Sequence, residues 1–270
     1  MYFIKCMKWF SIFITMLMFL FVTQSQTIAV VTIAPAFVDL RLDEGRPAGK
    51  FTLTNTGEKE ERFRIMASHF TIDESGEFFL TEPNQRSMAN WLKFNPKELV
   101  LPPKSKRSVR YMILPRGKLD KGTYWAAMEL ESLKSNAVKT KDAAGRSFKL
   151  EVSTSVIVPI FGTYGQCEEN FDIKDIYLSR NEGFGVVNAV LSNPHRSYHV
   201  VSGSFTISDE QGEIVSEGSL GRDYLLPMMT RRFSNRFSEN LTPGEYTVAV
   251  VFSSSVMSDN EVKKKELLWQ

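Results

Sequence analysis

Cysteine, histidine and net charge are all scarce in this sequence of 270 residues. Cys6 lies in the N-terminal segment, and its removal on processing would leave Cys167 with no partner for an internal disulfide. Nothing in the sequence around Cys167 lowers the pKa of its thiol, so we expect a packed or partly exposed thiol rather than a nucleophile. The net charge of +2 gives no electrostatic reason to expect nucleic-acid binding.

The short motifs of common catalytic sites are also missing. There is no G-x-S-x-G elbow, no P-loop and no G-x-G-x-x-G. His195 and His199 are four residues apart in a segment expected to be loop and strand, and no second pair of ligands has zinc spacing. Glu129 and Glu131 share one face of an expected strand, a spacing that is common by chance. We therefore expect no catalytic residues, no metal site and no cofactor.

Long apolar runs are absent, except for residues 9–22. Lys5 and Lys8 precede this run, and the small, polar segment 23–27 follows it. This order is typical of a secretory signal peptide, and the run is shorter than the roughly 18–20 residues that span a bilayer. Residues 1–26 are predicted to be a signal peptide, which predicts export; an uncleaved N-terminal anchor is the alternative.

Short β segments separated by turn residues fill the rest of the chain. Hydrophobic residues make up 43% and charged residues 24% of the sequence, an ordinary globular balance. About 245 residues remain after processing, which is the size of two domains. Strands that recur at short intervals with turns between them are typical of a β-sandwich. We expect strands at residues 29–42, 50–55, 62–72, 91–94, 99–101, 108–114, 123–133, 148–161, 171–178, 185–191, 200–207, 214–220, 231–237 and 246–252.

The sequence therefore predicts an all-β protein with two consecutive immunoglobulin-like β-sandwich domains. The first is expected at residues 27–164 and the second at 165–270. Pro35 marks an expected break or switch in strand pairing. Residues 123–133 contain helix-favouring side chains, but their alternation favours a strand. The tail, 261–270, carries three lysines, expected on a solvated face, and then an apolar end that completes a strand or docks on the domain.

The longest regular alternation lies at the end of the first domain, in residues 148–160. Apolar side chains and threonine alternate there with lysine, glutamate and serine. The alternation is longer than a typical strand, and a long edge strand is a template for pairing with another chain. A last core strand of the sandwich is the alternative. The side chains expected on the apolar face are Phe148, Leu150, Val152, Thr154, Val156, Val158 and Ile160.

The first domain resembles the periplasmic pilus-assembly chaperones of the chaperone–usher type. The family's order W-x-x-x-x-P, then L-x-P, then V-R is similar to that of residues 91–96, 99–103 and 108–110. Residues 33–40 and 51–57 resemble its first two strands, and residues 158–161 resemble the close of its donor strand. The resemblance implies a periplasmic, non-enzymatic chaperone that caps pilin-like or other incomplete β-sandwich subunits by donating strand 148–160. It allows an outer-membrane usher as a further partner.

The sequence departs from this family at two places. The family grips the subunit's terminal carboxylate with one basic residue on the first strand and another near the end of the donor strand. An arginine would be expected close to Phe37, but Arg41 lies further on, and residues 156–161 contain no lysine or arginine. The resemblance thus supports strand donation, which needs backbone groups and apolar side chains, and leaves carboxylate capture without its residues.

Two other functions compete with the chaperone. One is an exported structural or adhesive β-sandwich module with no chaperone activity. The other is a hydrolase or carbohydrate-binding module, in which exposed Tyr124 and Trp125 would stack on sugars. Core packing is the simpler expectation for both aromatic residues.

Overall fold

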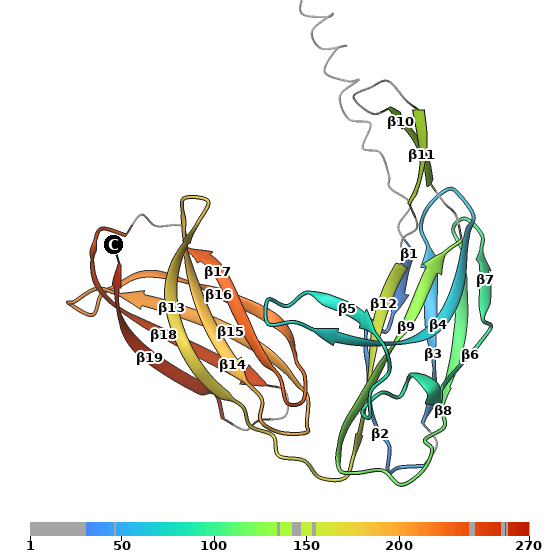
Figure 1. The fold of residues 1–270 in the computed structure, drawn as a ribbon, viewed down its shortest axis with the longest axis horizontal. Coiled ribbons are helices and arrows are strands. Elements are labelled where there is room, and N and C mark those ends of the chain that lie inside the picture. The colour runs from blue at the N-terminus through green and yellow to red at the C-terminus, as the bar shows by residue number, and fades with distance from the viewer. Residues whose placement is uncertain are drawn as a thin grey trace, which may run out of the picture.

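The computed structural model describes residues 31–269, apart from 46, 134–135, 142–146, 153–154, 238–240, 255–256 and 258. The predicted signal peptide, residues 1–26, lies outside this part of the chain. Strands make up most of the described residues, with one short 3₁₀ helix at Ala89–Trp91. In the described ranges no helix has the length and apolarity needed to cross a membrane. The chain is all-β and forms two immunoglobulin-like β-sandwiches (Figure 1).

The first sandwich consists of two sheets that enclose one core. One sheet has the strand order β1-β3-β8-β6, and the other has the order β2-β12-β9-β4-β5, with β7 also paired to β4. Phe51, Leu53 and Leu101 are fully buried between the sheets. The strands are β1 (Val31–Ala34), β2 (Val38–Arg41), β3 (Ala48–Asn55), β4 (Glu61–Ile72), β5 (Phe78–Thr81), β6 (Leu92–Asn95), β7 (Glu98–Leu101), β8 (Lys106–Ile113), β9 (Gly122–Ser132) and β12 (Ser155–Tyr164).

Strand β9 lies at the centre of this sandwich, between β4 and β12. Its first nine residues are all buried, so its two faces serve two different apolar clusters. Ala126 and Met128 belong to the core of the first sandwich, whereas Trp125 and Ala127 face a separate cluster. The predicted strand at 123–133 is confirmed, because alternation across a strand sends neighbouring side chains to opposite faces.

The second sandwich follows after residue 171 and has its own core. Its sheets have the orders β13-β14-β17 and β16-β15-β18-β19. Phe171, Phe205 and Phe252 are among its most buried side chains. The predicted boundary at 164–165 stays a prediction. The strands are β13 (Asp172–Asn181), β14 (Phe184–Ser192), β15 (His199–Ser208), β16 (Ile214–Leu225), β17 (Thr230–Phe237), β18 (Gly244–Ser254) and β19 (Glu261–Trp269).

The C-terminal tail is the edge strand β19, paired along its length with β18. The expectation that its lysines lie on a solvated face is only partly right. Lys263 donates hydrogen bonds to the carbonyl oxygens of Ile173 and Lys174, at 2.9 and 2.6 Å, and Lys265 pairs with Asp175 at 2.6 Å. These lysines therefore join β19 to β13, across the gap between the two sheets of the second sandwich.

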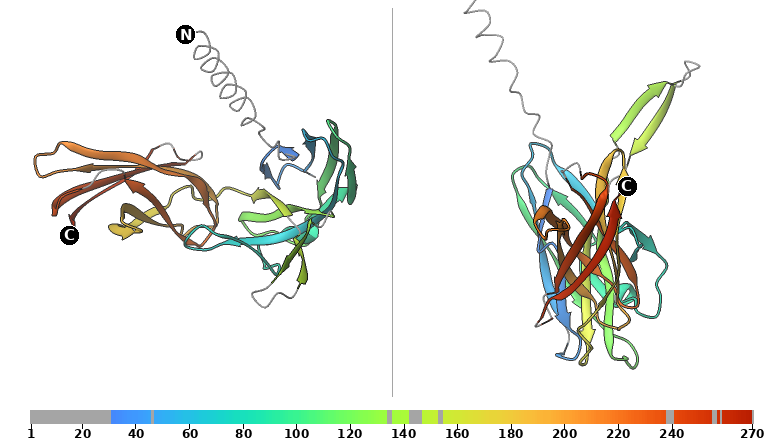
Figure 2. Two further views of the ribbon diagram at one scale, coloured as in Figure 1. Left: turned by 90° about the horizontal axis from the view of Figure 1, so that it is seen from above. Right: turned by 90° about the vertical axis from the view of Figure 1, so that its left-hand side faces the viewer.

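A third apolar cluster lies where the two sandwiches meet. It contains Phe70, Trp125 and Phe161 from the first sandwich and Tyr198 and Leu226 from the second. The β4–β5 hairpin, coloured cyan to teal, extends toward the second sandwich in both Figure 1 and Figure 2. Backbone hydrogen bonds cross the junction as well. They join the amide of Arg232 to the carbonyl of Glu74 and the amide of Thr123 to the carbonyl of Arg196, both at 2.7 Å.

Candidate functional site

Strand β12 is the part of the predicted donor segment that belongs to a sandwich. Its β-branched residues favour an extended, half-buried conformation. It pairs antiparallel with β9 over its full length, from Ser155 opposite Glu131 to Tyr164 opposite Gly122. One side of β12 is therefore completely occupied.

The other side of β12 is covered over only part of its length. Strand β2 runs parallel to it and pairs from Val38, opposite Ile160, to Arg41, opposite Thr163. Strand β1 pairs with β3 in the opposite sheet. The chain thus changes sheets in residues 35–37, and the switch predicted at Pro35 is confirmed. Among the described residues, no strand pairs with this side of residues 155–159.

The side chains of β12 pass from exposed to buried along the strand. Val156 is 44% exposed, whereas Val158 is 3% exposed and Ile160 is fully buried in the core of the first sandwich. Pro159 lies at the end of the open segment, as is usual for proline in sheets, because proline has no amide hydrogen to donate to a second neighbour. Residues 155–159 form an open strand edge, called the open edge below.

The prediction of one continuous edge strand over residues 148–160 is wrong in its pairing. Residues 147–152 form β11 (Ser147–Val152), which pairs with β10 (Asn136–Lys141) in a separate two-stranded sheet. Phe148, Leu150 and Val152 therefore have backbone positions in that hairpin, and Thr154 lies outside the described residues. Residues 136–141, which lie outside the strands predicted from the sequence, form a strand through this pairing.

Strand β10 could not be predicted from its residues, which are mostly lysine, threonine and alanine. Strand β11 holds these residues in an extended strand, because antiparallel pairing satisfies the backbone hydrogen-bonding groups whatever the side chains are. In Figures 1 and 2 the β10–β11 hairpin projects beyond the sandwich from the end of the β9–β12 pair.

A row of aromatic rings begins where the open edge stops. Phe37 precedes the first β2 residue paired to β12, is 39% exposed, and has its ring centroid 6.3 Å from that of Tyr224. Tyr224 lies 5.1 Å from Phe161, which stacks on Tyr198 at 3.9 Å. The row thus runs from exposed Phe37 into the buried junction. Sequence reasoning placed Phe37 on the first strand but gave no signal for its two tyrosine neighbours in the second sandwich.

A polar contact lies under this aromatic row. Burial raises the pKa of the Asp39 carboxyl, although a hydrogen bond with the Tyr198 hydroxyl acts in the opposite direction. Burial and the nearby Asp39 charge raise the pKa of Tyr198 well above its ordinary value, so its hydroxyl stays protonated. Arg41, the first arginine after Phe37, is paired with Asp43 at 2.5 Å. The contact between Asp39 and Tyr198 therefore crosses the junction, whereas the pair of Arg41 and Asp43 lies within the first sandwich.

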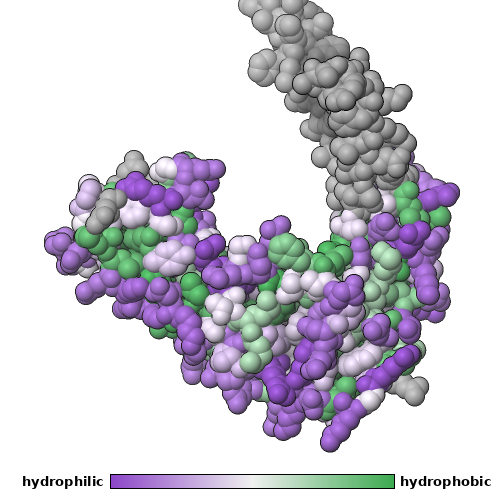
Figure 3. Space-filling view, viewed as in Figure 1, coloured by the Kyte–Doolittle hydropathy of each residue, from purple (hydrophilic) through white to green (hydrophobic). Residues whose placement is uncertain are grey.

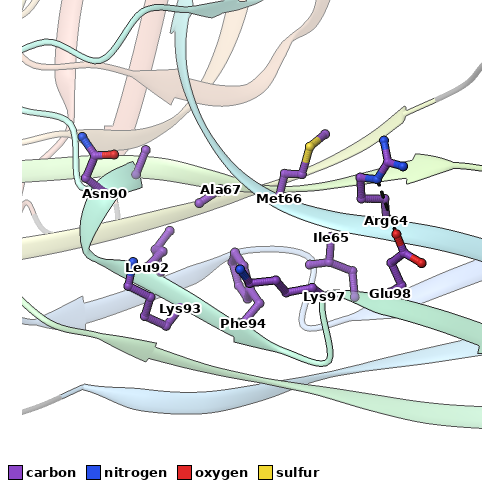
Figure 4. A pocket seen from close by; sticks show the side chains of 11 residues that line it. Arg64, Ile65, Met66, Ala67, Asn90, Leu92, Lys93, Phe94, Lys97 and Glu98 are labelled. Atoms are coloured by element: carbon purple, nitrogen blue, oxygen red, sulfur yellow. Dashed lines mark ion pairs between the residues drawn. The ribbon is translucent and has the colours of Figure 1, made fainter.

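A recess lies elsewhere on the first sandwich, between the edges of β4 and β6. It has a volume of about 480 Å³, with Ile65, Leu92 and Phe94 among its apolar lining residues. Figure 4 shows Lys93 and Lys97 beside Phe94, and an ion pair between Arg64 and Glu98 (3.7 Å) at one end. A hydrogen bond from the Ile65 amide to the Lys97 carbonyl joins β4 to the turn between β6 and β7.

The remaining sequence candidates have structural partners. Ser68 donates a hydrogen bond to Glu129 at 2.5 Å, and Arg64 donates one to Glu131 at 3.3 Å. Tyr124 and Trp125 are each only 5% exposed, so neither presents a face to a sugar. No cluster of metal-binding side chains occurs among the described residues.

His199 and Cys167 also lack the surroundings of reactive groups. Burial and the neighbouring His195 lower the pKa of His199 to about 4. His195 instead contacts Glu168, with 2.5 Å between Nδ1 and Oε2. Cys167 is partly buried, as predicted, and burial raises the pKa of its thiol. A thiol in that state is a poor nucleophile.

Comparison with known proteins gives a likeness in structure but not in sequence. No family model and no curated protein matches the chain. Among solved structures, the YadV chaperone is 10% identical, with a TM-score of 0.47 over 88% of this chain and 99% of that one. The Pseudomonas aeruginosa CupB2 chaperone is 12% identical, with a TM-score of 0.44 over 87% of this chain and 100% of that one.

A third similar structure is the CsuC–CsuE chaperone–tip adhesion subunit pre-assembly complex of Acinetobacter baumannii. It is 14% identical, with a TM-score of 0.45 over 88% of this chain and 98% of that chain. Because the identities are this low and the TM-scores are below 0.5, these likenesses say nothing about function. The function proposed below rests on the strands and side chains of this chain.

Proposed function

We propose that this protein is an exported, chaperone-like binder of incomplete β-sandwich subunits. The open edge of β12, residues 155–159, carries this proposal. A strand with one unpaired side offers backbone amides and carbonyls to the strand of another protein. The exposed side chain of Val156 would enter the apolar groove of the subunit, and the edge would complete its sheet.

The sheet switch supports the proposal. If β2 continued straight from Val38 toward the N-terminus, it would cover residues 155–159. Instead the chain turns away at residues 35–37 and joins the opposite sheet. The open edge therefore results from the course of the backbone between β1 and β2.

The β10–β11 hairpin provides a second region for contact. It lies beyond the open edge along the same pair of strands and contains the backbone of Phe148, Leu150 and Val152. We propose that a bound subunit follows the open edge toward this hairpin. Pilin-like subunits in the periplasm, with an outer-membrane usher as a further partner, fit the resemblance of the first domain.

The test compares partner recovery by the mature protein and by two single variants. Val156→Glu places a charge on the exposed part of the open edge, where it should leave the fold intact. Val262→Glu is the matched control, because Val262 is 54% exposed on β19, an edge strand of the second sandwich. Val158 is unsuitable, since a charge at this buried position would destabilise the core.

Each protein is purified from the envelope fraction of its own organism, and bound chains are identified by mass spectrometry. We expect a small β-rich subunit to co-purify with the wild type and with Val262→Glu. Its recovery should fall at least tenfold with Val156→Glu, because a carboxylate would have to be buried unpaired. Equal recovery with both variants, or a wild type that purifies alone, would contradict the proposal and favour a structural or adhesive module.

A further inference from the structure

The open edge has a defined end, and the residue at that end indicates which partner strand fits. A strand added beside residues 155–159 lies in line with β2, because β2 occupies the same side of β12 from Ile160 onward. It cannot pass that point without displacing β2. One end of the added strand therefore lies against the turn that contains Phe37.

Phe37 gives this end of the edge an apolar, aromatic surface. Its ring is 39% exposed, although it touches Tyr224 edge to face. The rings behind it are fixed, since Phe161 is fully buried and stacks on Tyr198 with 7° between the ring planes. Rings arranged in this way bind a further apolar or aromatic side chain, while charged groups prefer water.

The charged groups around the aromatic row are arranged in pairs. Arg231 binds Asp223 at 2.6 Å, and Arg41 binds Asp43. Arg222 is the exposed cation whose charge acts on Tyr224, and it opposes the effect of Asp223 on the pKa of that tyrosine. A terminal carboxylate at Phe37 would thus lie near Asp39 and Asp223 as well as near Arg222.

Resting on the proposed function, we infer that the partner strand carries an apolar or aromatic side chain at the end that faces the second sandwich, and that Phe37 selects it. Figure 3 shows hydrophobic surface in the hollow between the two sandwiches, flanked by polar surface. Phe37 then selects partners by the side chain at the end of their strand. The backbone of residues 155–159 pairs with any strand, whatever its sequence.

The test uses synthetic heptapeptides of alternating valine and threonine, acetylated and amidated so that the ends carry no charge. Two peptides carry phenylalanine at the first or the last position, and two matched peptides carry serine there. Affinities for the mature protein are measured by calorimetry. We expect one phenylalanine peptide to bind about 2- to 10-fold more tightly than its serine counterpart, the worth of one aromatic contact.

Three variants separate the inference from the proposed function. Phe37→Ala should remove the preference for phenylalanine and keep the binding of serine peptides, and Phe37→Leu should retain part of the preference. Val156→Glu should abolish the binding of all four peptides. Circular dichroism shows whether each variant is folded, and partial exposure of Phe37 makes its replacement tolerable.

Each of the other possible results contradicts either the inference about Phe37 or the proposed function. Wild-type binding with no preference between phenylalanine and serine overturns the inference and leaves strand addition in place. The inference is also overturned if a peptide with a free carboxylate binds more tightly than its amidated counterpart and Arg222→Gln removes this difference in affinity. Failure of the wild type to bind any peptide at millimolar concentration contradicts the proposed function, and the inference with it.

Discussion

At the scale of single residues, His199 shows how burial fixes a protonation state. Its side chain is 1% exposed and lies between the hydroxyls of Ser197 and Ser254, at 3.5 and 3.3 Å, with the ring of Phe171 beside it. His195, which also lowers the pKa of His199, is itself held by Glu168. The imidazole is therefore neutral in the folded protein at neutral pH.

This neutral histidine makes stability depend on pH. Because the pKa is about 4 when folded and 6.5 when unfolded, the unfolded chain takes up the proton first. The contribution is fully present above pH 6.5 and is lost as the pH falls toward 4. Between pH 7 and 5 it lowers the free energy of unfolding by about 2 kcal/mol. Urea denaturation should show a smaller loss over this range in His199→Gln; an equal loss would contradict the assignment.

At the scale of elements, strand β19 shows how an edge strand is tied down. Alternate residues face opposite sides, so Lys263 and Lys265 face β13 while Lys264 is exposed. Lys263 meets two carbonyl oxygens beside the irregular pairing at residues 173–175 of β13, where the ladder with β14 shifts register. The lysine thus gives two carbonyl oxygens of the edge strand β13 a hydrogen-bond donor.

Replacing this lysine should weaken the second sandwich. Lys263→Met keeps most of the aliphatic chain and removes the charged donor, so we expect the free energy of unfolding to fall by about 1–2 kcal/mol. Lys264→Met is the control and should change it by less than about 0.5 kcal/mol. Thermal and urea denaturation of the two variants make the comparison. A similar loss in both would show that net charge, rather than the contact with β13, is responsible.

At the scale of the whole molecule, the aromatic junction makes the two sandwiches depend on each other. Phe161 is fully buried and contacts Phe70 of its own sandwich and Tyr198 and Tyr224 of the other. The tip of the β4–β5 hairpin adds the backbone contact between Glu74 and Arg232. An interface with a buried aromatic centre couples the unfolding of its two sides.

We expect the wild type to unfold in one calorimetric transition and Phe161→Ala to unfold in two. Removing this ring deletes three aromatic contacts and should cost about 3–5 kcal/mol, mostly at the junction. Leu191→Ala is the control, because Leu191 is buried only in the core of the second sandwich. It should lower the melting temperature without splitting the transition. Two transitions already in the wild type would mean that the sandwiches unfold independently.

The sequence predicts most strands of this fold because their alternation and turn residues are local signals. The strand at 123–133 is an example, since its two apolar faces serve two clusters. Pairing partners are not local. The alternation in residues 148–160 runs through both β11 and β12, which pair with different strands in different sheets.

The candidate site could be predicted only in part for the same reason. Val156 and Val158 look equivalent in the sequence, but Val156 is exposed and Val158 is buried, because only Val158 reaches the core between the two sheets. The open edge depends on where β2 joins β12, and the aromatic row depends on how the second sandwich docks. No spacing of residues within the first domain contains that information.

The shortness of the open edge limits how long any complex can last. Residues 155–159 can form only a few backbone hydrogen bonds, each with a net worth of about 1 kcal/mol, and Pro159 can donate none. Such a ladder alone cannot hold a partner for long against the cost of association. Residence time would then be set by side chains such as Val156 and Phe37. In the proposed function, the protein would then exchange one subunit for another without unfolding.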